Sequence, residues 1–164
     1  MDLRLEPPEI PLLTDLYEVT MAASYFEHGF NDVASFSLSM RRMPENRGFM
    51  VAAGLERLLE LLEEFRFDAA AIDYLDSLRL FKPEFLEFLS RLRFTGSVRA
   101  MPEGTIFFAQ EPLAELSGPL IEVQLIETIA INQLGLASIL ATKAARCREV
   151  ARGRRLVDFG LRRA

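Results

Sequence analysis

The stretch Ala34-Ser35-Phe36-Ser37-Leu38-Ser39-Met40 alternates apolar side chains with serine along its whole length. Successive side chains of a β-strand point to opposite faces of a sheet, so this alternation predicts a strand with one buried and one polar face. Before it, the segment from Leu16 to about His28 is predicted to be a helix, with Thr14-Asp15 as N-cap and Gly29 at its end.

Three helices are predicted after this strand. Apolar residues recur at helical spacing from Val51 to Phe65, and Asp68 can cap a short helix that runs to about Leu78. Pro83 suits the first position of the third helix, with Phe85 and other apolar residues behind it. Three helices are thus expected to follow one strand.

Short strand-like runs follow, separated by prolines and glycines; they are Ser97–Met101, Thr105–Phe108 and Leu113–Ser117. We expect a small antiparallel sheet that the serine-rich strand can join. After Pro119 a long helix is predicted from Leu120 to about Ala151, with a break near Gly135.

The two ends of the chain are predicted to lie outside the first layer. Residues 1–13 are expected to form an extended arm, because Pro7, Pro8 and Pro11 exclude regular helix. Residues 155–159 are expected to form a final strand. No partner for that strand is identified in the pattern, so it resembles the first strand of a second domain.

Composition predicts a globular protein of the cytoplasm. Half of the 164 residues are apolar and 26% are charged, which is ordinary for a folded chain. Neither a membrane-spanning run nor a secretory signal is visible in the sequence. The single Cys147, in a predicted helix, is expected to be a packing thiol.

The net charge of −5 is unevenly distributed. From Lys143 onward there are eight basic residues and two acidic ones, and the rest of the chain is acidic. A basic end suggests an anionic partner, either a nucleic acid or a phosphorylated small molecule, although a solvated helix face would have the same composition.

Metal and nucleophile chemistry find little support in the sequence. His28 and Cys147 are the only histidine and cysteine, and no Gly-rich phosphate loop is present. The remaining candidates are arginines and aromatics. Arg41-Arg42 follow the alternating strand and Arg162-Arg163 follow the final one; a planar guanidinium matches carboxylate and phosphate oxygens.

A series of short motifs, in order along nearly the whole chain, resembles the amino-terminal part of the nicotinate phosphoribosyltransferase family. The matching segments are Leu13-Thr14-Asp15-Leu16-Tyr17 with Thr20-Met21, Phe36 through Arg41-Arg42, Ala52-Ala53-Gly54-Leu55, Pro102-Glu103-Gly104, Ser117-Gly118-Pro119-Leu120 through Gln124-Leu125-Ile126-Glu127-Thr128, Ala141-Thr142 with Ala144-Ala145-Arg146, and Asp158-Phe159-Gly160-Leu161-Arg162-Arg163-Ala164. A single motif of this length would be weak, whereas the ordered series is specific.

The resemblance implies an α/β fold class. An α+β open-faced sandwich domain over residues 14–118 follows the arm of residues 1–13. Residues 119–164 then supply a long buried helix and the first strand of an incomplete α/β barrel. The family resemblance further implies a homodimer whose active sites straddle the interface.

The resemblance also implies roles for six residues in binding nicotinate and phosphoribosyl pyrophosphate. Phe159 would stack on one face of the pyridine ring, and Tyr17 of the neighbouring subunit would cover the other. Arg162 would lie along the base site with Arg163 nearby. Arg41 would reach toward the phosphate end of phosphoribosyl pyrophosphate, and Asp15 would help to order the turn that carries Tyr17.

Mg²⁺ and ATP are implied as cofactors, but the main residues that bind them in the family lie beyond residue 164. Lys143 stands where the family commonly has asparagine, a departure from the pattern. No metal ligand and no catalytic residue is expected in this chain itself. We therefore expect the chain alone to be inactive, as a fragment or as one piece of a split enzyme whose second chain carries the barrel.

Three other interpretations remain open from the sequence. A nicotinamide or quinolinate phosphoribosyltransferase would share the chemistry, although Arg162-Arg163 favours a substrate with a carboxylate. A non-catalytic dimerisation module would use only the helices and the sheet. A nucleic-acid binder would use the basic end, but no reader motif is present there, so we expect neither a nucleic acid nor a membrane as partner.

Overall fold

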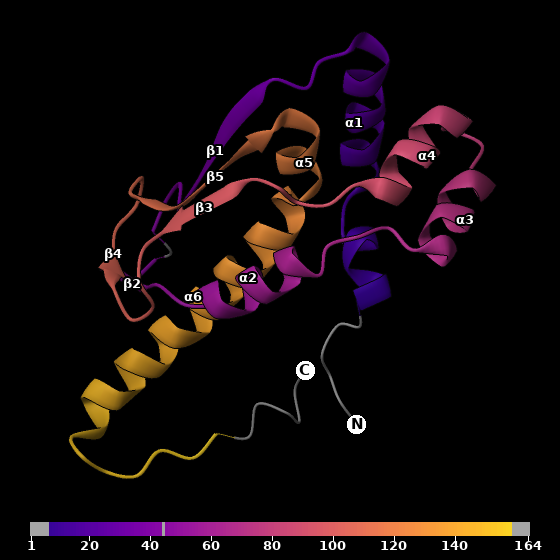
Figure 1. The fold of residues 1–164 in the computed structure, drawn as a ribbon. Helices are drawn as coiled ribbons and strands as arrows, with labels where there is room; N and C mark the ends of the chain where they lie inside the picture. Colours follow the sequence, from indigo (N-terminus) through magenta and orange to yellow (C-terminus); the bar gives the residue numbers. More distant parts are fainter. Residues whose placement is uncertain (1–6, 44, 159–164) are drawn as a thin grey trace.

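The computed structural model describes residues 7–43 and 45–158. Their elements, in chain order, are the 3₁₀-helix η1 (Pro7–Leu12), α1 (Leu16–His28), β1 (Val33–Ser39), β2 (Met50–Val51), α2 (Leu55–Glu63), α3 (Ala69–Ser77), α4 (Pro83–Arg91), β3 (Ser97–Ala100), β4 (Ile106–Phe107), β5 (Pro112–Pro119), α5 (Leu120–Leu125) and α6 (Glu127–Ala151). This mixture of helices and small antiparallel sheets confirms the predicted α/β class (Figure 1).

A three-stranded antiparallel sheet with the order β1-β5-β3 forms the centre of the fold. Phe36 of β1 and Val98 of β3 both lie opposite Leu116 of β5. Along β1 the serines are more exposed than Ala34, Phe36 and Leu38, up to the last serine. The predicted alternation and the predicted pairing of this strand with the later runs are therefore confirmed.

A second, two-stranded sheet joins β2 and β4, with Met50 opposite Phe107. The prediction that residues 105–108 belong to the same sheet as the other runs is therefore wrong. Strand β2 was not predicted, because two residues are too few to establish a period. Both Met50 and Phe107 are buried, so this small sheet closes one end of the core.

Helices α3 and α4 occupy the segments predicted for them, whereas α2 begins at Leu55 and not at the predicted Val51, which lies in β2. The Asp68 side chain caps α3 by accepting a 2.8 Å hydrogen bond from the Ala71 backbone N–H, and Pro83 occupies the start of α4. Each helix places its apolar stripe in the core, where Leu58, Leu75 and Phe85 are almost fully buried. An amphipathic helix of this kind is stabilised mainly by that burial.

The long helical stretch turns at Ile126, not near Gly135, so the predicted position of the break is wrong. A glycine inside a helix costs only about 1 kcal/mol relative to alanine, which α6 tolerates. The turn at Ile126 is set by packing. Helix α5 contacts β1, β5 and α1, while α6 continues in a direction that brings it against α2 and β2.

Both predicted terminal segments differ from expectation. Residues 7–12 form a 3₁₀-helix, because the fixed φ of proline suits that geometry even though it excludes an α-helix interior. Residues 154–158 have no regular secondary structure, so the predicted strand is wrong over 155–158. A strand forms only where a neighbour supplies backbone hydrogen bonds, and neither sheet of the described residues extends to it.

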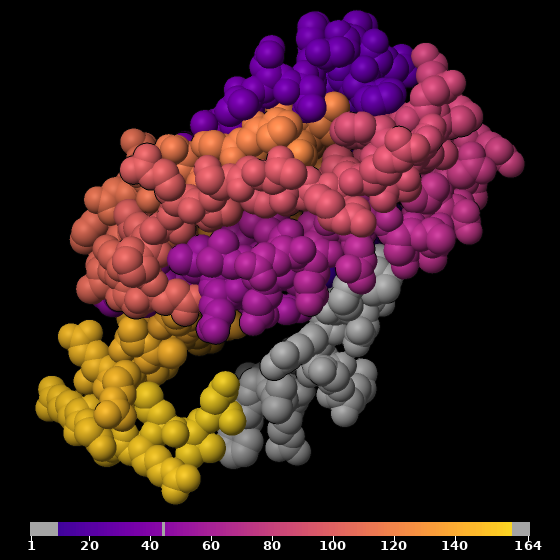
Figure 2. All heavy atoms as spheres, viewed as in Figure 1, coloured from indigo at the N-terminus to yellow at the C-terminus, as the bar shows by residue number. Residues whose placement is uncertain are grey.

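The carboxyl-terminal half of α6 and residues 152–158 extend away from the body of the molecule (Figure 2). Cys147 is exposed on this segment, so the expectation of a packing thiol is wrong.

Within the described residues, no helix combines the length and the apolar character that crossing a bilayer requires. The predicted domain boundary at residues 118 and 119 stays a prediction.

Candidate functional site

The first turn of α1 carries two of the predicted site residues, Asp15 and Tyr17. Asp15 is the N-cap with an extended backbone, and its carbonyl oxygen accepts a 3.0 Å hydrogen bond from the Glu18 backbone N–H. Its carboxylate makes no capping bond to the helix and is exposed. The Tyr17 side chain is 52% exposed. This turn therefore presents an acid and an aromatic ring at the surface.

Glu18, next to Tyr17, is only 1% exposed, and its carboxylate interacts with the Tyr17 phenol. Its Oε1 atom accepts a 2.8 Å hydrogen bond from the Thr128 hydroxyl, and its Oε2 atom accepts a 3.4 Å bond from Gln124 Nε2. The same Gln124 amide donates to Glu127 Oε2 at 3.3 Å. A buried carboxylate thus ties the start of α1 to the junction of α5 and α6.

This environment shifts the pKa values of two groups. Burial is the main cause that raises the pKa of Glu18; the charge of Glu127 adds to it, and the hydrogen bond from Thr128 opposes it. The pKa of Tyr17 is raised chiefly by the negative charge of Glu18. The phenol therefore stays neutral around neutral pH, and a neutral aromatic ring at the surface can stack on a flat ligand.

The hydroxyl of Thr14 lies in the turn that leads into α1. Its Oγ1 atom is buried and, within the part of the chain that the structure describes, has no hydrogen-bond partner. Leaving a buried hydroxyl unpaired costs free energy.

The other four predicted site residues are not brought to this turn by the described coordinates. Arg41 is exposed just past β1, and no hydrogen bond or ion pair between it and the α1 turn is found among residues 7–43 and 45–158. Phe159, Arg162 and Arg163 lie outside the described residues. Their assignments, like that of Arg41, stay predictions.

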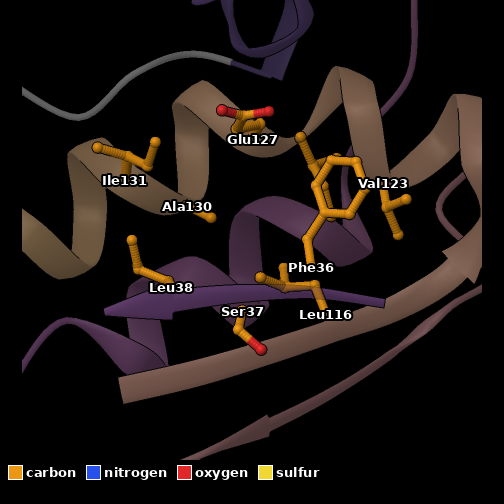
Figure 3. Close-up of a pocket in the computed structure, with 9 residues that line it drawn as sticks. Phe36, Ser37, Leu38, Leu116, Val123, Glu127, Ala130 and Ile131 are labelled. Atoms are coloured by element: carbon orange, nitrogen blue, oxygen red, sulfur yellow. The ribbon is translucent and has the colours of Figure 1, made fainter. Parts of the chain in front are cut away.

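A cavity of about 200 Å³ lies between β1 and the α5–α6 junction (Figure 3). Its lining is mostly apolar, with Phe36 and Leu38 from the strand and Val123 and Ala130 from the helices. Glu127 is the one ionisable residue of that lining. The predicted site residues that the structure describes do not line this cavity, so it is separate from the surface formed by Asp15 and Tyr17.

Several motif residues of the family pattern form scaffold instead of surface. The Glu103 carboxylate accepts 2.8 Å hydrogen bonds from the backbone N–H groups of Gly54 and Leu55, which begin α2. The Thr142 hydroxyl of α6 accepts a 2.8 Å bond from the Val51 N–H of β2. The first two bonds join the loop around Glu103 to the start of α2, and the third joins β2 to α6, at the end of the molecule opposite α3 and α4 (Figure 1).

The sequence reasoning missed Glu18 as a site residue. A signal was present, because Glu18 shares a helix face with the buried Ala22 four positions later. A charged residue on an apolar helix face requires a buried partner. The partners Gln124 and Thr128 lie more than 100 residues away, and helical spacing alone could not identify them.

No group of histidine, cysteine, aspartate or glutamate side chains suited to holding a metal ion occurs in the described part of the chain.

The protein-family model of the nicotinate phosphoribosyltransferase N-terminal domain matches residues 12–134 of this chain. Over 153 residues the chain is 50% identical to nicotinate phosphoribosyltransferase pncB2 of Mycobacterium tuberculosis, covering 93% of this chain and 33% of the relative. It is 43% identical over 159 residues to the human nicotinate phosphoribosyltransferase, covering 94% of this chain and 30% of the relative.

A solved structure of a protein with the same enzyme name has a similar fold. The crystal structure of human nicotinic acid phosphoribosyltransferase superimposes with a TM-score of 0.78 at 41% identity, over 87% of this chain and 29% of that one. The chain thus spans about a third of the length of the relatives that it matches.

Proposed function

The chain belongs to the nicotinate phosphoribosyltransferase family, and we propose that it forms the amino-terminal part of an enzyme that joins nicotinate to phosphoribosyl pyrophosphate. Ribose 5-phosphate would be transferred to the ring nitrogen of nicotinate, with loss of pyrophosphate, to make nicotinate mononucleotide for NAD salvage. The family match over residues 12–134 is the observation that carries this proposal.

Within this enzyme, the α1 turn would form one wall of the pyridine site. The exposed ring of Tyr17 would stack on the pyridine of the neighbouring subunit's site, and Asp15 would order the turn. Phe159 would cover the opposite face of the ring, with Arg162 and Arg163 facing the carboxylate. Binding of this kind accelerates the reaction by orienting the ring nitrogen toward the sugar carbon.

The leaving group requires positive charge. As pyrophosphate departs, negative charge accumulates on it while the sugar carbon becomes cationic. Arg41, which is exposed past β1, would supply a guanidinium toward the phosphate end of phosphoribosyl pyrophosphate. Mg²⁺ would share that charge and ATP would be linked to turnover, both held mainly by residues beyond 164.

The exposed apolar side chains of α6 support the proposal that another protein surface packs on this helix in the complete enzyme. Leu136 and Leu140 are each 57% exposed and lie one helical turn apart. Apolar surface of this kind favours association. We infer that the remaining two thirds of the enzyme, or the second subunit of a homodimer, packs on this face. The enzyme would work in the cytoplasm.

A hybrid enzyme tests the proposed function. Residues 1–164 replace the matching part of the Mycobacterium tuberculosis relative, and product formation is measured with nicotinate, nicotinamide or quinolinate as the acceptor. We expect synthesis of nicotinate mononucleotide and preference for nicotinate, and we expect no turnover by residues 1–164 alone. A folded hybrid that prefers nicotinamide or quinolinate, or that binds no nicotinate, would contradict the proposal.

A further inference from the structure

We propose that Glu18 is a positioning residue that holds the first turn of α1, and with it Tyr17 and Asp15, against the α5–α6 junction. The inference that this arrangement serves pyridine binding rests on the proposed function. The mechanical part of the proposal, that Glu18 fixes the turn, does not depend on it.

Glu18 and Tyr17 are adjacent in the sequence but differ in burial. Glu18 is 1% exposed, whereas its neighbour Tyr17 is 52% exposed. The two side chains leave adjacent positions of one helical turn, so fixing the first fixes the backbone from which the second projects. The position of the Tyr17 ring is therefore set by what Glu18 contacts.

Two hydrogen bonds to Glu18 come from outside its own helix. Thr128 lies in the first turn of α6 and donates at 2.8 Å, and Gln124 lies in the last turn of α5 and donates at 3.4 Å. Both donors flank the bend at Ile126. The carboxylate thus receives hydrogen bonds from two helices at the point where the chain changes direction.

Burying the Glu18 carboxylate costs free energy that an apolar side chain at this position would not cost. Removing a carboxylate from water is unfavourable unless hydrogen bonds compensate it. Glu127 adds a second negative charge nearby, and its Oε2 shares the Gln124 amide with Glu18. An apolar residue at position 18 would pack against Val19 and Ala22 without this cost, but it would leave the Thr128 hydroxyl without its acceptor. Glu18 therefore adds a directional constraint that apolar packing does not provide.

Two other anchors of the turn are weaker. Asp15 contributes a backbone acceptor to the Glu18 N–H but no side-chain cap. The Thr20 hydroxyl donates to the Tyr17 carbonyl at 2.8 Å, within the same helix. Neither bond connects the turn to another element. The connection of this turn to α5 and α6 by hydrogen bonds thus runs through Glu18 in the described residues.

The mechanical arm of the test uses the 164-residue chain and amide hydrogen exchange of the first turn of α1. Glu18→Ala should exchange about tenfold faster there, since a buried hydrogen-bond network is lost. Glu18→Gln should stay within about threefold of the parent chain, because its amide oxygen can still accept from Thr128. Thr128→Val, which keeps the shape of the side chain, should show intermediate exchange.

Glu27→Gln is the matched control, because Glu27 is an exposed acid on the same helix whose carboxylate pairs with Lys82 at 3.2 Å. It should leave exchange of the first turn unchanged. Exchange in Glu18→Ala that matches the parent chain, or exchange in Glu18→Gln as fast as in Glu18→Ala, would overturn the proposal. If Glu18→Ala does not fold, Thr128→Val with unchanged exchange overturns it equally.

A second arm follows the tyrosine ring itself. Tyr17 titration is read from ultraviolet absorbance, with Tyr17→Phe to identify its contribution among the three tyrosines. Removing the charge of Glu18 by the Gln substitution should lower the Tyr17 midpoint, because the Glu18 charge is the main cause that raises this pKa; Glu127 and Asp15 remain as smaller causes. A midpoint that does not move would show that Glu18 does not lie beside the phenol.

The third arm links the turn to substrate. In the hybrid enzyme, Glu18→Ala should raise the KM for nicotinate about tenfold with little change in kcat, and Glu18→Gln should restore it. Equal KM values for parent and Glu18→Ala would overturn the role in binding. A hybrid that never uses nicotinate contradicts the proposed function instead, and the first two arms still decide whether Glu18 holds the turn.

Discussion

Glu103 and Leu55, which are 48 residues apart in the chain, are joined by a 2.8 Å hydrogen bond from the Leu55 backbone N–H to the Glu103 Oε1 atom. The Gly54 N–H donates to the same oxygen at 2.8 Å. The first N–H groups of a helix have no partner inside the helix and carry its partial positive charge. Helix α2 is thus capped by an acid from a distant loop, not by its own N-cap residue.

Glu103→Ala should destabilise the fold by about 1 to 2 kcal/mol, the usual cost of losing a helix cap. Urea denaturation measures the difference in unfolding free energy. Glu63→Ala, an exposed acid at the other end of α2, is the control and should change stability by less than about 0.5 kcal/mol. Equal effects of the two substitutions would show that the cap contributes nothing.

Gly54→Ala should destabilise the protein more severely, by roughly 2 to 5 kcal/mol, because two unfavourable terms add. Gly54 has φ +97°, and a Cβ atom there would lie 2.5 Å from the Gln133 carbonyl oxygen. Gly135→Ala is the matched comparison, since a Cβ in α6 at that position meets nothing within 4 Å. That substitution should stabilise α6 by about 0.5 to 1 kcal/mol, and thermal unfolding of both variants distinguishes the two sites.

Thr142→Val should cost about 1 to 3 kcal/mol of unfolding free energy. The substitution preserves shape but removes the acceptor for the Val51 N–H of β2, and Thr142 is fully buried. Thr20→Val, at an exposed hydroxyl of α1, provides the control and should be nearly neutral. A Thr142→Val variant as stable as the parent in chemical denaturation would mean that the bond to β2 is not needed.

The unfolding free energy should depend on pH through the titration of the Glu18 carboxyl group. Its pKa is raised in the folded state, so the folded protein binds this proton more tightly than the unfolded chain does. The resulting stabilisation is present below the ordinary pKa of 4.5 and is lost as pH rises through the raised value. Glu18→Gln cannot titrate. Its unfolding free energy relative to the parent should therefore increase with pH across that window and level off above it, when both proteins are denatured in urea at a series of pH values. A difference that decreases with pH would contradict the assignment.

The local features of the fold were predictable from sequence, and the long-range ones were not. The alternation around Phe36 predicted β1, and Asp68 and Pro83 marked the starts of α3 and α4, because each signal acts within a few residues. The bend at Ile126 depends on α5 packing against β5 and β1, and periodicity contains no information about such a contact. Strand β2 was missed because two residues are too few to establish a period, and the break was expected near Gly135 because glycine is a weak helix former.

The candidate site was only partly accessible to sequence reasoning. Tyr17 and Asp15 were identified by family resemblance, and the structure places them in one exposed turn. The buried acid beneath them was overlooked, because its partners Gln124 and Thr128 come from the far end of the chain. A charged residue on an apolar helix face is the signal that would have found it.

The central claim is that the exposed ring of Tyr17 faces the pyridine substrate, and steady-state kinetics of the hybrid enzyme with nicotinate test it most directly. Tyr74 on α3 is the matched control, since its side chain is 54% exposed, close to the 52% of Tyr17. Tyr17→Ala should lower kcat/KM for nicotinate by about tenfold or more, as loss of a stacking ring predicts, and Tyr74→Ala should leave it unchanged. Equal values of kcat/KM for the two variants would contradict the claim.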